Sequence, residues 1–414
     1  MIHPTVFWKT RGAPGAAAAL LIAIMCTGIA ALSRSSAATG EELNEEAREL
    51  FDPRRPPEAE LAMSIADDFT LATVGDCIIS RPLSHLRTRD GAFDAVVKIL
   101  RHADAAFGNL ETSIIDIRHF EGHPHSGEGD WGLTTLPAVA GDLAAMGFDL
   151  FSRANNHVLD WGMEGMRETG RRLDEAGIVH AGAGEDRAAA RAARYFESEK
   201  GRIGLVSMAS TYGALAAALA PAGESPGRPG LSALRVKRYT IVPHDVMGSL
   251  AGIDRAIREF RGDGKNNPGK ESDAGSGAES PDELSLFGIE FRLGKRFAYR
   301  YEMNGLDLAE ILKSIRLGKQ HSDFLIATIH AHQSAFDRYA PGGFLQELAR
   351  AAIDAGADAF ITHGIHHLGP IEVYEGKPIF YGLANFFWSD IQEPLAPDLH
   401  EAYRDLIAKA FLDP

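Results

Sequence analysis

Residues 148–162, FDLFSRANNHVLDWG, run from a short apolar stretch into a polar motif and then into the start of a helix. The composition of Phe148–Phe151 predicts a strand, and Asn155-Asn156-His157 follow it closely. Met163–Ala176 then shows helical periodicity that stops at Gly177. A strand that leads polar side chains into the loop before a helix is typical of α/β sheets, whose ligands bind outside the carboxyl ends of the strands.

The same order, an apolar strand followed by polar residues, recurs along the chain. It is found at Phe69–Val74 before Gly75-Asp76, at Asp104–Phe107 before Gly108-Asn109-Leu110-Glu111, at Phe324–Ile329 before His330, and at Asp358–Ile361 before Thr362-His363. We also expect a strand at Arg202–Met208, a helix at Leu345–Ala355, and a hairpin of Ile371–Tyr374 and Pro378–Tyr381 around Glu375-Gly376. Strands that alternate with helices predict an α/β layered fold.

The polar residues at these strand ends form a candidate metal site. They are Asp76, Glu111, Asn156 with His157, His330, and His363 with His366. Carboxylate and imidazole groups suit Mn, Fe, Zn or a similar divalent ion. Two such ions about 3.5–4 Å apart can clamp both the attacking and the leaving oxygen of a phosphoester.

Several of these residues also fit a purely structural role. Asp76 after a glycine fits a turn, and Asn155 or Asn156 fits a cap of the following helix. In an extended segment His330 and His332 face opposite ways, so we expect at most one of them at the site.

Other polar residues near these motifs are open to two interpretations. We expect Asp160 to cap the helix that starts near Gly162, and Asp104 and Asn385 to be structural. The polar loop Glu121–Trp131 fits either a solvated surface or a surface that faces substrate.

The composition of the 414-residue chain is that of a globular protein, with 45% hydrophobic and 24% charged residues. Its formal net charge of −15 argues against a nucleic-acid backbone as partner, because that binding depends on clustered Lys and Arg. Cys26 and Cys77 are the two cysteines, which excludes a zinc site of the CxxC type. A metal must therefore use His, Asp, Glu and Asn.

The N-terminal residues 1–38 have the order of a secretory signal: Lys9 and Arg11, an apolar run over 16–32, and the small residues Ser36-Ala37-Ala38. A retained membrane anchor is the alternative, and either predicts export to the periplasm or cell surface. Residues 39–67 form an acidic leader, and 68–414 form the main domain. Within that domain 262–283 are rich in Gly, Ser, Asn, Asp and Lys, which predicts a flexible insertion.

A group of motifs, in this order, resembles the CapA family of poly-γ-glutamate capsule-biosynthesis proteins over about Thr70 to Trp388. They are Gly75-Asp76, Asn109-Leu110-Glu111, Asn155-Asn156-His157-Val158-Leu159-Asp160-Trp161-Gly162, His363-Gly364-Ile365-His366, and Ile379-Phe380-Tyr381-Gly382-Leu383-Ala384-Asn385-Phe386. The resemblance implies a fold similar to calcineurin-type metallophosphoesterases, a four-layer sandwich of two mixed β-sheets flanked by helices.

The resemblance also implies roles for single residues. Asp76 and His366 would hold one ion, Asn156, His330 and His363 would hold the other, and Glu111 would bridge them. His157 would be the general acid, and Asp76 would belong to the catalytic centre. Ile78 stands where that superfamily has a further His, and Ala331-His332-Gln333 replaces the usual Trp-Gly-x-Glu. The sequence is therefore consistent with a site for one ion and with a site for two.

Three functions follow from this pattern. The first is an exported CapA-like protein in the synthesis, anchoring or export of an anionic polymer, with metal-dependent hydrolase or transferase chemistry and a membrane synthase as partner. The second is a general periplasmic phosphoesterase, and the third is a non-catalytic subunit that binds polymer. The sequence alone does not choose between an enzyme and a binding protein.

Overall fold

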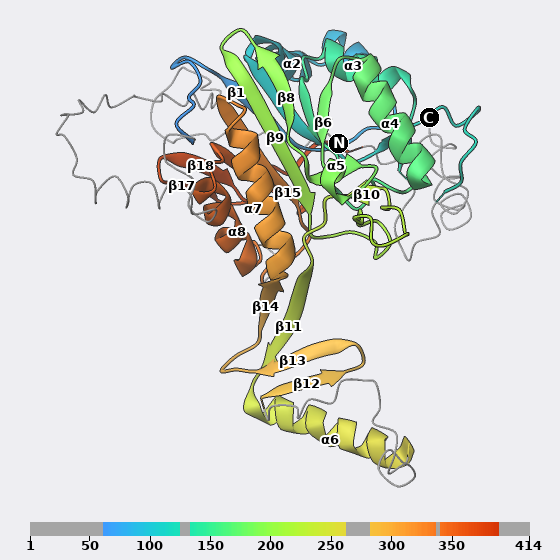
Figure 1. The fold of residues 1–414 in the computed structure, drawn as a ribbon, viewed down its shortest axis with the longest axis vertical. Coiled ribbons are helices and arrows are strands. Elements are labelled where there is room, and N and C mark those ends of the chain that lie inside the picture. Colours follow the sequence, from blue (N-terminus) through green and yellow to red (C-terminus); the bar gives the residue numbers. More distant parts are fainter. Residues whose placement is uncertain (1–60, 125–132, 262–281, 337–339, 389–414) are drawn as a thin grey trace, which may run out of the picture. The chain divides into compact units, whose positions relative to one another are not determined.

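The computed structural model describes residues 61–124, 133–261, 282–336 and 340–388. They form two compact units (Figure 1). Unit 1 takes the described parts of 1–234, 306–332 and 349–414, and unit 2 takes those of 235–305 and 333–348. The expected signal segment, most of the acidic leader and residues 262–281 of the expected insertion lie outside the described residues.

A five-stranded sheet forms the first layer of strands in unit 1. In spatial order its strands are β19 (Asn385–Trp388), β1 (Leu71–Ile78), β2 (Ala105–Leu110), β5 (Leu150–Ser152) and β6 (Val179–Ala181). Each neighbouring pair is parallel. The carboxyl ends of β1, β2 and β5, and the polar motifs that follow them, therefore lie at the same edge.

A six-stranded sheet forms the second layer of strands. In spatial order its strands are β17 (Ile371–Tyr374), β18 (Lys377–Phe380), β16 (Ala359–His363), β15 (Phe324–His330), β9 (Gly201–Ala209) and β8 (Arg194–Ser198). The four central strands are parallel, and the two edge strands are antiparallel to their neighbours. His330 and His363 are register partners at the ends of β15 and β16.

The two sheets face each other across a shared apolar core. Phe107 and Leu150 of the five-stranded sheet belong to the same buried cluster as Leu205, Ile326 and Ile361 of the six-stranded sheet. The expected sandwich of two sheets is thus confirmed, although the five-stranded sheet is parallel throughout and only the other is mixed.

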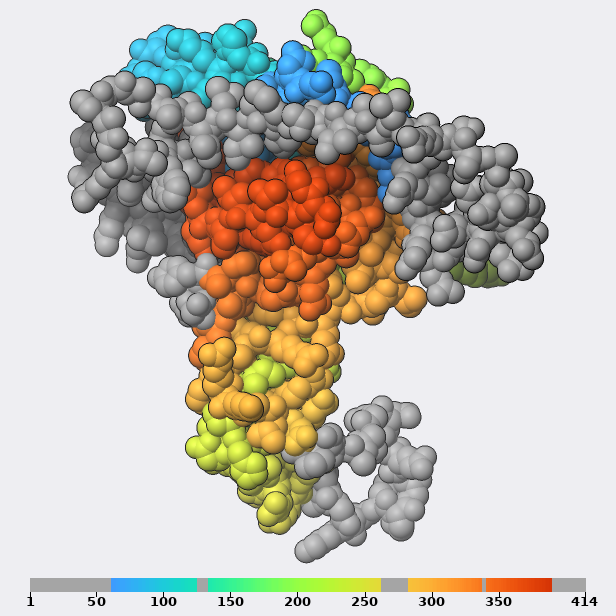
Figure 2. Space-filling model, turned by 90° about the vertical axis from the view of Figure 1, so that its left-hand side faces the viewer, coloured from blue at the N-terminus to red at the C-terminus, as the bar shows by residue number. Residues whose placement is uncertain are grey.

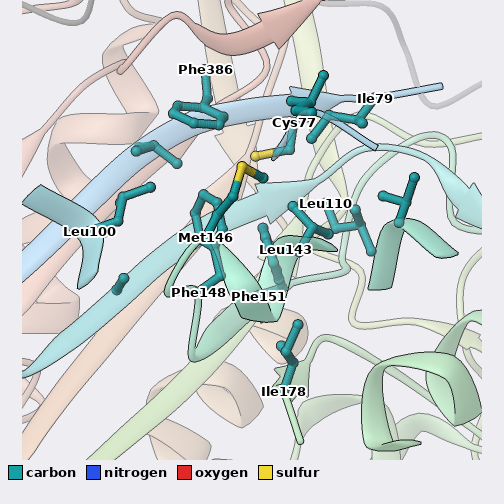
Figure 3. Packing of buried hydrophobic residues seen from close by; sticks show 14 of the residues in the cluster. Cys77, Ile79, Leu100, Leu110, Leu143, Met146, Phe148, Phe151, Ile178 and Phe386 are labelled. Atoms are coloured by element: carbon teal, nitrogen blue, oxygen red, sulfur yellow. The ribbon is translucent and has the colours of Figure 1, made fainter. Parts of the chain in front are cut away.

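Helices cover the outer faces of the sandwich. They are α2 (Gly91–His102), α3 (Ala138–Ala145), α4 (Gly162–Glu175), α7 (Gly305–Lys319) and α8 (Gly343–Asp354, of which unit 1 takes the part from Ala349). Figure 3 shows the layer under α2 and α3, where Leu100 and Leu143 pack with Cys77 and Phe386 of the strands. On the other side, Gly318 of α7 lies against Val206 and Leu325. Figure 2 shows the surface of unit 1 formed by residues after about 345, in orange to red.

Short elements complete unit 1. They are η2 (Ser84–Thr88), β3 (Ser113–Ile114), β4 (Thr134–Thr135), β7 (Ala183–Gly184), β10 (Gly230–Leu231) and α5 (Arg187–Arg191).

Unit 2 is a four-stranded sheet with one helix. In spatial order its strands are β12 (Glu283–Leu286), β13 (Ile289–Leu293), β11 (Val236–Val242) and β14 (Ala298–Met303). The helix α6 (His244–Arg261) packs Met247 against Leu284 and Leu286. We did not expect this unit from the sequence, because its strands are rich in charged residues and show no continuous apolar run.

Most elements expected from the sequence are confirmed within one to three residues. The hairpin of β17 and β18 turns at Glu375 and Gly376, which both have positive φ. One boundary was wrong: β1 continues through Gly75 to Ile78, with a register shift at Asp76. Asp76 is therefore not a turn residue but a strand residue whose position is fixed by pairing on both sides.

Gly75 is required where β1 meets the chain before β19. A Cβ at this position would lie 1.8 Å from the carbonyl oxygen of Ala384. We expect Gly75→Ala to lower the free energy of unfolding by about 1–3 kcal/mol or more, because backbone has to move. Chemical denaturation measures the effect. Gly91→Ala is the control, since a Cβ there meets nothing within 4 Å and the helix favours alanine. Equal losses for the two variants would contradict this account.

Candidate metal centre

Asp76 lies fully buried at the edge where the strand ends meet. Its Oδ1 accepts a hydrogen bond from Asn109 Nδ2 (2.9 Å), and its Oδ2 accepts one from the Gly364 N–H (3.1 Å) and lies 3.2 Å from His366 Nδ1. Burial alone raises the pKa of Asp76, but the bond to His366 and the nearby imidazoles outweigh it and hold the pKa below its usual value. Asp76 is therefore an ionised carboxylate.

Glu111, just after β2, is the second buried carboxylate. Its Oε1 lies 3.6 Å from His330 Nε2 and 4.0 Å from His157 Nε2. Its Oε2 is buried and has no hydrogen-bond partner among the described residues. Burial, followed by the charges of Asp76 and Asp160, raises the pKa of Glu111 well above its usual value. A buried acceptor without a donor is costly, and a cation beside it would remove that cost.

His330 and His332 bring two ring nitrogens together. Their Nε2 atoms are 3.0 Å apart, so they share one proton or direct both lone pairs at one cation. Loss of hydration and the neighbouring imidazoles lower the pKa of both rings, that of His332 to about 4. Neutral imidazole is the form that binds metals.

The expectation that only one of these two rings faces the site was wrong. The alternation that separates their faces holds only within a strand, and β15 ends at His330. The chain then turns, and the His332 N–H donates to Thr211 Oγ1. That bond helps to place the ring beside His330.

His366 is held between two strand ends. Its Nδ1 lies 2.8 Å from Asn385 Oδ1, and its ring meets Trp388 edge-on at 5.1 Å between centroids. Burial acts to lower the pKa of His366, but Asp76 and Asn385 outweigh it and raise the pKa. The residue has a φ of +53°, a conformation that a residue other than glycine adopts only when its surroundings fix it.

His363 lies apart from the cluster of ring nitrogens. Its Nδ1 is 3.1 Å from Thr328 Oγ1, and its Nε2 is 3.1 Å from the Val74 carbonyl oxygen, to which it donates. The ring also packs edge-on against Phe107. The structure thus engages both nitrogens of His363 in the core, and its role as a ligand stays a prediction.

His157 forms a pair with Asp160. Its Nδ1 lies 2.8 Å from Asp160 Oδ2, which also accepts a bond from the Leu133 N–H. This arrangement leaves His157 Nε2 directed at Glu111. The expected helix cap at Asp160 was wrong: the cap residue of α4 is Trp161, without a side-chain cap bond, and Asp160 instead orients His157.

Asn155 and Asn156 have different surroundings. Asn155 Nδ2 donates to Asn109 Oδ1 and to the Leu110 carbonyl, and its Oδ1 accepts from the His157 N–H, so it ties the motif to the end of β2. Asn156 Oδ1 is buried and has no hydrogen-bond partner among the described residues. A side-chain oxygen in that state suits a ligand role.

Two groups of side chains offer ligand atoms within 4.8 Å of one another. They are Asp76 with Glu111 and His330, and Glu111 with His332 and His366. Glu111 belongs to both groups. The oxygen and nitrogen donors and the orphaned oxygens of Glu111 and Asn156 fit one divalent ion or two.

Sequence reasoning missed four residues that the structure adds to this centre. They are Asn109, His332, Asn385 and Trp388. Asn109 and Asn385 lie inside the motifs but carried no separate signal. Asp104, in contrast, is structural as expected, because it accepts bonds from the N–H and hydroxyl of Thr70. Most of the Glu121–Trp131 loop (residues 125–131) lies outside the described residues.

The fold and this centre define a class: a two-sheet α/β protein with carboxylate, imidazole and amide groups gathered at the carboxyl ends of its strands. Residues 70–389 match the family model "Bacterial capsule synthesis protein PGA_cap", and the chain belongs to this family.

The chain is also similar to several individual proteins. The chain is 46% identical over 342 residues to the uncharacterized protein y4sH of Sinorhizobium fredii, covering 83% of this chain and 71% of that protein. It is 25% identical over 325 residues to the PGA biosynthesis protein CapA of Bacillus subtilis, covering 78% of this chain and 64% of that one. A phosphatase structure from Mycoplasma pneumoniae matches with a TM-score of 0.36 and 11% identity over 78% of this chain and 73% of that one.

Glu111 makes stability depend on pH in a defined direction. Its raised pKa in the folded chain means that the folded state binds this proton more tightly than the unfolded state, whose value is near 4.5. The contribution of Glu111 to the free energy of unfolding of the metal-free protein then falls as pH rises above about 4.5.

We expect Glu111→Gln to remove this slope, because the amide cannot ionise. The variant should gain stability over the wild type from pH 5 to pH 8, by about 1.4 kcal/mol for each unit of the pKa shift, and lose the gain below pH 4. Urea denaturation with a chelator present measures it. A variant less stable than the wild type at pH 8 would contradict the assignment.

Proposed function

We propose that this chain is a metal-dependent hydrolase or transferase that acts on a phosphoester or amide bond during the synthesis, anchoring or export of an extracellular anionic polymer such as poly-γ-glutamate. The observation that supports it most is Glu111, a buried carboxylate with a free oxygen, surrounded by His330, His157 and Asp76. A buried carboxyl group with an oxygen that makes no hydrogen bond does not stabilise the fold. We therefore assign the free-energy cost of burying it to function.

The proposed chemistry divides between the cation and the protein. Asp76, Glu111, Asn156, His330, His332 and His366 would hold one or two divalent ions, which supply stabilisation of charge that develops on the scissile group. The hydrogen bonds from Asn109 and Gly364 keep Asp76 ionised and in place. This framework fixes the ligands before substrate arrives.

His157 is the proposed general acid. Because Nδ1 donates to Asp160, Nε2 is the atom that carries the transferable proton, and it faces the carboxylate cluster. Asp160 holds the ring in this orientation and stabilises its charged form. His157 would give its proton to the leaving oxygen or nitrogen.

A non-catalytic accessory role is the second candidate, and Ile78 favours it. This residue is 2% exposed and pairs with Trp388 at the end of β1. It puts an apolar side chain where metallophosphoesterases have a further ligand. A centre that holds one ion could bind polymer carboxylates without cleaving anything.

We also propose that the chain acts in the periplasm or at the cell surface, with a membrane synthase as partner. The support is the order of residues in the N-terminal segment 1–38. None of the helices in the described ranges combines the length and apolar character that crossing a bilayer requires.

Metal content and activity, measured together, test the proposal. Purified protein should contain a divalent ion, and with Mn²⁺ it should cleave a generic phosphodiester or poly-γ-glutamate. Asp76→Ala and His366→Ala should lose both metal and activity. Cleavage of phosphodiesters but not of polymer would favour a general phosphoesterase. Bound metal with no turnover of any substrate would favour the accessory role.

His157→Gln should lower kcat about 10²–10⁴-fold while metal content stays unchanged, because it removes the proton donor and no ligand. The matched control is His321→Gln. This histidine is exposed and precedes the first residue of β15, whereas His330 is the last residue of that strand. Equal losses for both substitutions would exclude His157 as the acid.

Asp160→Asn tests the positioning of that acid. The amide cannot stabilise the imidazolium, so kcat should fall and the limb of the pH–rate profile that reports the acid should shift to lower pH. Unchanged activity and an unchanged profile would leave Asp160 with a purely structural bond to Leu133.

A further inference from the structure

Unit 2 exposes large apolar side chains that do not belong to the candidate metal centre. Phe260, at the end of α6, is 93% exposed, and Phe287, in the turn between β12 and β13, is 75% exposed. Ile253 and Ile289 are 46% and 40% exposed. Single exposed apolar residues are ordinary, but a group of them at one place marks an interaction site.

The topology of unit 2 places Phe260, Phe287 and Ile289 at one end, and Ile253 lies nearer the middle of α6. β11 and β13 are parallel, with Val242 beside Leu293, and α6 begins two residues after Val242. The helix packs back over the strands through Met247 and Ile257. Phe260 is about 24 Å along the helix, whereas β13 spans about 17 Å. The helix end thus reaches the level of the β12–β13 turn, and Figure 1 shows both on the same side of the unit.

The backbone at Phe287 is unfavourable for this residue. Phe287 and Gly288 have φ values of +54° and +74° and form a two-residue turn closed by the pair Leu286 and Ile289. Such turns favour Asn or Gly at the first position, because a side chain in the left-handed region costs about 1–2 kcal/mol. An exposed phenylalanine here is explained neither by the turn nor by the core.

These aromatic rings also differ from the other exposed aromatics of the unit. Phe297 and Phe336, each 48% exposed, stack on one another at 6.0 Å between centroids. Within the described ranges, the contacts between aromatic rings involve neither Phe260 nor Phe287. Phe287 lies in a tight turn and Phe260 is the next-to-last residue of α6, so each stands at the end of its element.

The apolar face of α6 continues beyond the part that the strands cover. Val246, Leu250 and Ile257 pack in the core of unit 2, and Ile253 and Phe260 extend the same spacing of three and four residues. The segment that follows, 262–281, contains no large apolar residue that could cover Phe260. The charged side chains near it on the helix are Arg255, Arg258, Arg261, Asp254 and Glu259, and Arg258 pairs with Asp254 at 2.7 Å.

We propose that this end of unit 2, formed by Phe260, Phe287 and Ile289, is a membrane-contact tip that inserts its side chains into the interfacial layer of a lipid bilayer. A bilayer accepts convex apolar side chains, and nearby arginines can reach its headgroups. The apolar run at 16–32, as a secretory signal or as a retained anchor, predicts export, which would bring the chain to the outer side of a bilayer. The tip would hold unit 2 at the surface through contacts separate from that run.

An environment-sensitive fluorophore reports on the tip itself. The full chain carrying Cys26→Ser is labelled at Phe287→Cys or Phe260→Cys with a nitrobenzoxadiazole dye, while buried Cys77 stays unlabelled. The matched control is Phe297→Cys, an exposed aromatic at the opposite end of the same sheet. The vesicles contain phosphatidylcholine with and without phosphatidylglycerol.

Insertion predicts a blue shift and loss of iodide quenching on adding vesicles for labels at 287 and 260, and neither change at 297. Emission that stays unchanged at 287 and 260 while the protein co-sediments with vesicles overturns the proposal. A blue shift that needs no vesicles and grows with protein concentration also overturns it, in favour of contact between copies of the chain. A shift only with phosphatidylglycerol supports insertion aided by the arginines.

Discussion

Two carboxyl groups, Asp76 and Glu111, are buried within reach of each other, and the candidate centre is arranged around them. Burying ionised groups is costly unless donors or cations surround them. Around Asp76 the fold places an asparagine and a backbone N–H that donate hydrogen bonds to it, and a histidine beside it. It leaves one oxygen of Glu111 without a hydrogen-bond partner in the described part of the chain. The parallel sheet makes this possible, because it gathers the carboxyl ends of β1, β2 and β5 at one edge.

The sequence was sufficient to predict the layers of unit 1 and most of the polar residues at its strand ends. Strands such as β15 and β16 are buried on both faces, so they read as continuous apolar runs with clear ends. The polar motif 155–162 is as easy to recognise in the sequence as these strands. The four-stranded sheet of unit 2 was not predicted, because strands such as β11, with exposed Lys237 and Arg238, do not differ in composition from loops.

The errors within the centre share a cause: local rules were applied beyond the element that justifies them. Alternation put His332 on the wrong side because it was extended past the end of β15. Cap preference assigned Asp160 to the helix, although a histidine three residues earlier competes for the same oxygen and obtains it. His363 is a separate case and not an error. It ends its strand, its ring is held in the core by Thr328 and Val74 in a long-range arrangement that no local pattern reveals, and its role as a ligand stays a prediction.

Cys77 follows Asp76 directly and lies in the packed layer shown in Figure 3. Burial first, and then the negative charges of Asp76 and Glu111, raise the pKa of its thiol. Because only the thiolate reacts, this cysteine is protected from disulfide exchange while β1 stays paired with its neighbours. The rate at which Cys77 reacts with a thiol reagent therefore reports how often β1 opens to solvent. Each such opening also exposes the Asp76 carboxylate and breaks the hydrogen bonds that hold it.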